Sequence, residues 1–132
     1  MTNEEYLEYL KKADFEKQLA KLETKLKNTE VILYGAGEFL EAIKHFFNLS
    51  GLNVVGICDR RFYEEQEGSL FCGYKIIPYS KLKDSNTKTI LVCTLKYINI
   101  IDNLEKLFAG KKIKIEPLVK KSFLSEIKEI FG

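Results

Sequence analysis

The sequence has little of what builds most metal and disulfide sites. Its 132 residues include one histidine, three cysteines, two prolines and no tryptophan. Cys58, Cys72 and Cys93 form no C-x-x-C pair, and His45 is not close to any of them in the sequence. We therefore expect no zinc or other metal site. We interpret Cys58 and Cys93, each within an apolar run, as buried structural thiols.

Long apolar runs are absent too. No stretch approaches the ~20 apolar residues that span a bilayer. The opening Met-Thr-Asn-Glu-Glu lacks the basic start and apolar stretch of a secretory signal. The sequence thus predicts a cytoplasmic protein with no membrane partner.

A strong overall charge is also lacking, because the net charge is only +2. The charges are unevenly placed: residues 1–80 carry 13 acidic and 10 basic side chains, and residues 81–132 carry 6 acidic and 11 basic ones. No aromatic-interleaved RNA-binding motif accompanies the lysines of the second part. We interpret these lysines as a solvated face and expect no nucleic-acid partner.

The first 28 residues are predicted to form a helical segment. Thr2 and Glu5 have the spacing of a capping box, and a break is expected near Ala13-Asp14. An apolar stripe extends over residues 3–27. The stripe packs either on the chain's own sheet, which is the commoner outcome, or on a partner, as in a homodimer or a complex with another enzyme.

Strands and helices alternate after this segment. An apolar, β-branched run at 30–34 ends at two glycines, helical spacing follows up to Ser50-Gly51, and a second apolar run covers 53–58. This order is that of a βαβ unit. The further elements expected are strands at 74–77, 89–94 and 112–116, a loop at 60–73, a helical turn at 79–83, and helices at 97–110 and 122–131.

The alternation predicts an α/β fold for residues 29–132. We expect a three-layer, Rossmann-like parallel sheet of about five strands in the order 3-2-1-4-5, with the N-terminal helical segment added to it.

The glycine loop after the first strand is the best candidate site. Gly35 and Gly37 permit a sharp turn into a helix, whose free N–H groups and positive dipole end suit a phosphate. Asp59 ends the second strand 22 residues later, where an acid binds ribose in dinucleotide-binding domains. The candidate nucleotide-binding residues are Gly35, Ala36, Gly37, Glu38, Phe39, Asp59, Arg60, Arg61, Thr94 and Lys96.

The dinucleotide fingerprint is incomplete. Leu40 stands at its third glycine position and opposes the closest approach of helix and strand. Glu38 adds negative charge beside the loop, which Arg60 and Arg61 can offset, and either arginine can bind a phosphate directly. Thr94 ends the fourth strand, where it either bonds a phosphate or sugar hydroxyl or caps the following helix.

No catalytic machinery is visible in the sequence. His45 lies two turns into the helix after the glycine loop, away from the expected crevice, and we interpret it as structural. The chain shows no Ser-His-Asp or Cys-His arrangement. The sequence therefore assigns no catalytic residue and leaves open whether the protein is an enzyme.

Four motifs resemble a recurrent bacterial Rossmann-like module. They are V-I-L-Y-G-A-G-E-F-L at 31–40, N-V-V-G-I-C-D at 53–59, C-G-Y-K-I-I-P at 72–78 and T-I-L-V-C-T at 89–94. The module resembled is attached to sugar acetyltransferases of the left-handed β-helix class, and to FkbM-type methyltransferases and glycosyltransferases of surface-polysaccharide synthesis. In the acetyltransferases it binds the UDP part of a nucleotide sugar. The resemblance implies that Gly35–Gly37 and Asp59 contact nucleotide or sugar.

The chain contains neither the hexapeptide-repeat β-helix nor the methyltransferase domain of those proteins. We therefore expect a non-catalytic module for a nucleotide or UDP-type nucleotide sugar in glycan synthesis, part of a larger protein or complex. One alternative is a fragment of an NAD(P)-dependent oxidoreductase. Another is a protein-interaction domain with a vestigial nucleotide loop.

Overall fold

Four parallel strands form the central sheet, in the order β2-β1-β5-β6. The computed structural model describes residues 1–121, so the helix predicted at Ser122–Phe131 lies outside the described part. Strands β1 and β5 occupy the middle of the sheet, and their residues are buried almost throughout, as expected where helices cover both faces. The strands are β1 Glu30–Tyr34, β2 Asn53–Cys58, β5 Thr89–Val92 and β6 Lys114–Pro117.

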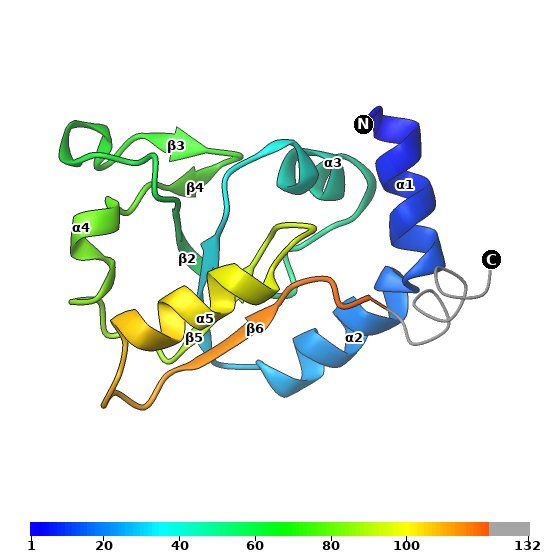
Figure 1. Ribbon diagram of the computed structural model, residues 1–132. Helices are drawn as coiled ribbons and strands as arrows, with labels where there is room; N and C mark the ends of the chain where they lie inside the picture. The colour runs from blue at the N-terminus through cyan, green and yellow to red at the C-terminus, as the bar shows by residue number, and fades with distance from the viewer. Residues whose placement is uncertain (122–132) are drawn as a thin grey trace.

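Helices cover both faces of the sheet (Figure 1). Alternate residues of β1 point to opposite sides: Val31 and Leu33 pack with α1, α2 and α3, whereas Ile32 packs with α4 and α5. The predicted three-layer α/β fold is therefore confirmed. The helices are α1 Asn3–Lys12, α2 Phe15–Lys25, α3 Glu38–Phe46, α4 Tyr79–Leu82 and α5 Ile98–Leu107. No helix within residues 1–121 has both the length and the apolar character needed to cross a bilayer.

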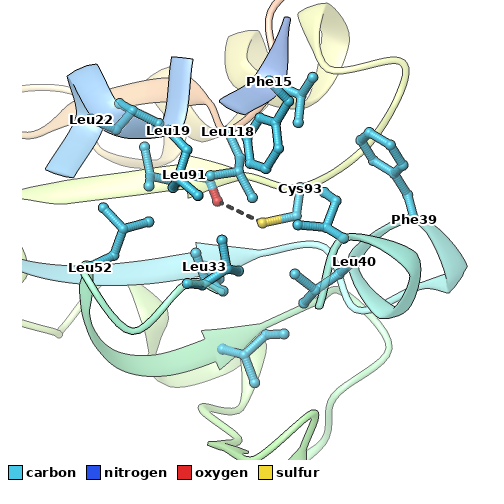
Figure 2. Close-up of a cluster of buried hydrophobic side chains, with 14 of the residues drawn as sticks. Phe15, Leu19, Leu22, Leu33, Phe39, Leu40, Leu52, Leu91, Cys93 and Leu118 are labelled. Carbon is cyan, nitrogen blue, oxygen red and sulfur yellow. Dashed lines mark hydrogen bonds between the residues drawn. The ribbon is translucent and has the colours of Figure 1, made fainter. Parts of the chain in front are cut away.

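The N-terminal helices belong to the chain's own core. Thr2 and Glu5 form the predicted capping box, and Asp14, with φ of +54°, separates α1 from α2 at the predicted break. Phe15 is fully buried, and its ring meets that of Phe47 edge-on at 5.0 Å. Figure 2 shows the side chains of α2 directed toward Leu33 of β1 and Leu91 of β5. The apolar stripe thus packs in cis, on the sheet.

The predicted strand order is confirmed for four strands, but the predicted third strand at 74–77 is almost missing. Within this stretch, Ile76 makes a single parallel bridge to Ile57 of β2 but does not itself belong to a strand. Tyr74–Lys75 (β4) instead pairs antiparallel with Leu70–Phe71 (β3). Cys72 and Gly73 both have positive φ, which suits a two-residue hairpin turn. The segment thus forms a separate two-stranded hairpin that pairs with β2 only at this bridge, so the parallel sheet has four strands and not five.

Candidate functional site

The glycine loop lies at the carboxyl end of the central strand β1. Its neighbours β2 and β5 end beside it, because Tyr34 is in register with both Cys58 and Val92. The backbone N–H of Gly35 donates to Cys58 at 2.9 Å, and that of Cys93 donates to Tyr34 at 2.7 Å. Three strand ends therefore meet at Gly35, the position where open α/β sheets bind their ligands.

Gly35 is required by the fold. Its φ is +111°, and a Cβ built there would stand 2.9 Å from Cγ2 of Thr94 and 3.3 Å from the carbonyl oxygen of Cys93. The backbone of Cys93 and the side chain of Thr94, which directly follow β5, leave no room for a larger residue at Gly35.

Gly37 is not required in this way. Its backbone is extended, with φ of −137°, and apart from its neighbours in the chain no described residue has an atom within 4 Å of the place where a Cβ would stand. Gly37 is the N-cap of α3, and no side chain caps this helix end. The first-turn N–H groups of α3 have no acceptor within the helix, so this helix end offers donors toward open space.

Asp59 and Arg61 hold the middle residue of the loop from both sides. Oδ2 of Asp59 accepts a hydrogen bond from the backbone N–H of Ala36 at 2.8 Å. Oδ1 accepts from the backbone N–H of Arg61 at 3.0 Å and from its Nε at 3.2 Å. The guanidinium of Arg61 in turn donates from Nη2 to the carbonyl oxygen of Ala36. The loop conformation is thus fixed by the residues that follow β2.

The charge of Asp59 is stabilised where it stands. Burial, which leaves its side chain only 17% exposed, opposes ionisation. The hydrogen bonds from Ala36 and Arg61 and the charge of Arg61 outweigh this, so the pKa of Asp59 lies below its ordinary value. Asp59 is therefore ionised at neutral pH, and its oxygens are already engaged by N–H groups of the loop region.

Residues Glu38 to Leu40 face the N-terminal helices. Phe39 is 6% exposed, and its ring lies 5.7 Å from that of Tyr6 and 5.9 Å from that of Tyr9. Leu40 is fully buried in the same core, and a carboxylate oxygen of Glu38 accepts from the hydroxyl of Tyr6 at 3.5 Å. In this site Phe39 and Leu40 offer backbone N–H groups, and their side chains belong to the core.

Thr94 lies beside Gly35 as the strand order predicts, but it does not cap α5. The N-cap of α5 is Tyr97, with no side-chain cap, and Oγ1 of Thr94 donates to the carbonyl oxygen of Lys96 at 3.2 Å. Arg60 is exposed, and its guanidinium lies 5.9 Å from the ring of Tyr79. Thr94, Asp59 and the glycine loop are thus brought together, whereas Arg60 points toward the start of α4.

A pocket beside Arg60 was not foreseen from the sequence. It has a volume of about 380 Å³ and lies between the segment after β2 and the first residues of α4. Its signal in the sequence is the pair of aromatic residues that follows Asp59-Arg60-Arg61, together with Tyr79 after Pro78. The lining residues are Arg60, Phe62, Tyr63, Glu64, Glu65, Tyr79 and Ser80.

The sheet order and the strand–glycine loop–helix unit define a Rossmann-like α/β fold. No protein-family profile matches the chain, and no curated protein matches it. One similar solved structure is of a protein designated RSP in complex with β-NAD+ and operator DNA, with 18% identity and a TM-score of 0.49 over 88% of this chain and 62% of that chain. Another is of RSP with β-NADH, with 20% identity and a TM-score of 0.48 over 78% and 57%.

The chain therefore spans only about three fifths of the length of those structures, 62% and 57%.

Proposed function

We propose that this chain is a nucleotide-binding module whose β1–α3 loop holds a phosphate group of the ligand. The observation that carries the proposal is the open space at Gly37, beside the uncapped N-terminus of α3. Free N–H groups and the positive end of the helix dipole favour an anion there. The fold does not need glycine at this position, whereas a phosphate that approaches the backbone does.

The pocket beside Arg60 suits the base of the same ligand. It follows Asp59 directly in the chain, and it offers the rings of Tyr63 and Tyr79 and the guanidinium of Arg60. Aromatic rings and arginine both stack on nucleobases. A nucleotide with its phosphate at Gly37 and its base in this pocket would pass over Asp59 and Arg61.

Two ligand classes fit this arrangement. The resemblance of residues 31–94 to a nucleotide-sugar module implies a UDP-type ligand and a role in glycan synthesis. The acid at the end of β2, 22 residues after Gly37, is the feature that favours NAD(P) instead. Both classes place a pyrophosphate at the α3 N-terminus, and they differ in what occupies the pocket beside Arg60.

The test is the unfolding temperature in the presence of UDP, UDP-sugars, GDP- and CDP-sugars, NAD+, NADH, NADP+, coenzyme A and S-adenosylmethionine. A ligand at 100 times its dissociation constant adds about 2.7 kcal/mol, which is a shift of several degrees for a domain of this size. We expect a selective rise with UDP-type ligands, and NAD+ or NADH is the second expectation. If no ligand in the panel raises the unfolding temperature, the proposal is wrong and the loop serves only the turn.

A matched pair of variants locates the site. Gly37→Val adds a side chain where no described atom stands in the way, so we expect normal folding and loss of the ligand-induced shift. Asn86→Val makes a similar apolar change at an exposed position before β5, at the amino end of the sheet, and is expected to keep the shift. A shift that survives Gly37→Val would place the ligand elsewhere.

A further inference from the structure

A groove with basic edges lies between α2 and the chain that continues from β6. Its volume is about 320 Å³. Leu22, Pro117 and Leu118 supply buried apolar surface, and Lys21, Lys25 and Lys120 are exposed around it. We call this feature the lysine groove.

The lysine groove keeps a net positive charge and a fixed shape. Its acidic residue, Glu116, is paired with Lys25 at 2.9 Å and with Lys114 at 3.6 Å, so it does not neutralise Lys21 or Lys120. Gln18 donates from Nε2 to the carbonyl oxygen of Lys120 at 2.9 Å and accepts from its N–H at 2.8 Å. These two bonds fix α2 to the opposite wall, so the groove is built into the fold.

The opposite kind of surface lies in the segment 63–70, which we call the acidic loop. Tyr63 and Leu70 are each 65% exposed, and Glu64, Glu65 and Glu67 lie between them in the chain. Glu67 is paired with Lys81 at 2.6 Å, which leaves an excess of negative charge on Glu64 and Glu65.

The acidic loop has a defined shape as well. The side chain of Gln66 accepts from the backbone N–H of Tyr63 at 2.8 Å, and the N–H of Gln66 donates back to the carbonyl oxygen of Tyr63 at 3.0 Å. The backbone N–H of Glu67 donates to the carbonyl oxygen of Glu64 at 3.1 Å. An exposed apolar and acidic surface is therefore held in one conformation, so little ordering is needed for it to dock.

The two features belong to opposite edges of the sheet. The acidic loop follows β2, and the lysine groove is lined by β6, which is the other edge strand. Figure 1 shows the hairpin β3–β4 and the segment before it at one side of the sheet, and α2 and β6 at the other. We propose that two copies of this chain associate head to tail, with the acidic loop of one copy docked in the lysine groove of the other.

Apolar side chains and charge both favour this contact. Leu70 is the apolar group that enters the groove over Leu22 and Pro117, and Glu64 and Glu65 meet Lys21 and Lys120. Because the two surfaces are different and lie on opposite edges, the contact is heterologous and leaves one free groove and one free loop on every pair. Further copies can add, so the average mass rises with protein concentration and falls with salt, which screens exposed charges.

Sedimentation velocity on the full chain without nucleotide tests the proposal, so that its outcome is independent of the proposed ligand. The groove variant is Lys21→Glu/Lys120→Glu, and the loop variant is Glu65→Gln/Leu70→Ser, which carries no positive charge that could pair with the altered groove. We expect the wild type to associate at low salt and each variant alone to remain a monomer. An equimolar mixture of the two variants is expected to give only dimers, because the intact loop of the groove variant docks in the intact groove of the loop variant.

The control is Lys83→Glu/Lys106→Glu, which makes the same change in net charge as the groove variant, at exposed positions just after α4 and in α5 that do not line the groove. It is expected to associate as the wild type does. A wild type that stays monomeric at all concentrations overturns the proposal. So does a mixture of the two variants that stays monomeric, or a groove variant that associates alone.

Discussion

The carboxylate of Asp59, at the end of β2, accepts a hydrogen bond at 2.8 Å from the backbone N–H of Ala36, in the loop that follows β1. These residues are 23 positions apart in the chain, and the bond fixes the loop against the neighbouring strand. Asp59 thus has a structural duty that is independent of any ligand. A loss of nucleotide binding on replacement of Asp59 would therefore not show by itself that its carboxylate touches the ligand.

Asp59→Asn is expected to lower the free energy of unfolding at pH 7 by about 1–3 kcal/mol, because it removes the charge and keeps only one of the two oxygens that accept from Ala36 and Arg61. The pKa of Asp59 is lower in the folded chain than the value of about 3.9 in an unfolded one. The stabilisation is therefore complete above about pH 4 and is lost as the pH falls through the folded-state pKa. Urea unfolding of both proteins between pH 7 and pH 3 measures this.

Acidification should reduce the stability of the wild type more than that of Asp59→Asn. Parallel pH profiles for the two proteins would contradict the assignment of a lowered pKa to Asp59.

The two glycines of the loop are expected to respond differently to alanine. Gly35→Ala strains a backbone with φ of +111° and brings a Cβ to 2.9 Å from Thr94, so we expect a loss of about 1–3 kcal/mol. Gly37→Ala enters open space in an extended backbone and should change stability by less than about 0.5 kcal/mol. Thermal unfolding of both variants measures these changes in stability. Equal losses of stability would mean that the fold also requires glycine at position 37.

Phe15→Ala should be among the most damaging single changes. The ring is fully buried in the core and lies edge-on to the Phe47 ring, and removing such a ring costs about 3–5 kcal/mol. Glu16→Ala, at the adjacent exposed position, is the control and should cost less than about 0.5 kcal/mol. If Phe15→Ala were equally harmless, α2 would be an appendage and not part of the core.

The three thiols should react at different rates with an Ellman-type reagent. Burial raises the pKa of Cys58 to about 12 and also raises that of Cys93, and both side chains are buried. Cys72, in the hairpin turn, is half-buried and is expected to react alone in the folded protein, with all three reacting in guanidinium. Cys72→Ser should abolish the reaction of the folded protein. Fast reaction of a second thiol would contradict the burial of β2 and β5.

Periodicity and turn chemistry were sufficient to predict most of the fold. The capping box at Thr2, the break at Asp14 and the order of the four strands follow from local spacing and from the handedness of βαβ units. The hairpin β3–β4 could not be predicted, because residues 74–77 (Y-K-I-I) have the composition of a short strand and because cysteine rarely adopts the positive φ that Cys72 has in the turn.

The proximity of the candidate site residues was predictable in part. Glycines between a strand and a helix, and an acid at the next strand end, identified Gly35, Gly37 and Asp59 as neighbours. Their different duties could not be predicted, because they depend on contacts with other strands. Only the structure shows that a Cβ at Gly35 would strike Thr94, that Gly37 faces open space, and that Arg61 returns to Ala36. The pocket beside Arg60 likewise requires Tyr79, from a distant segment.

The core on the α1–α2 face joins the beginning of the described chain to its end, since Leu10 and Phe15 pack in the same cluster as Leu118 and Val119. During synthesis from the N-terminus, the two helices emerge roughly 90 residues before their last packing partners. At about 5–20 residues per second, this leaves their apolar side chains exposed for several seconds. The nascent chain therefore exposes part of the apolar stripe of α1 and α2 until β6 has been synthesised. A chaperone that shields residues 3–27 would act on this protein before it could fold.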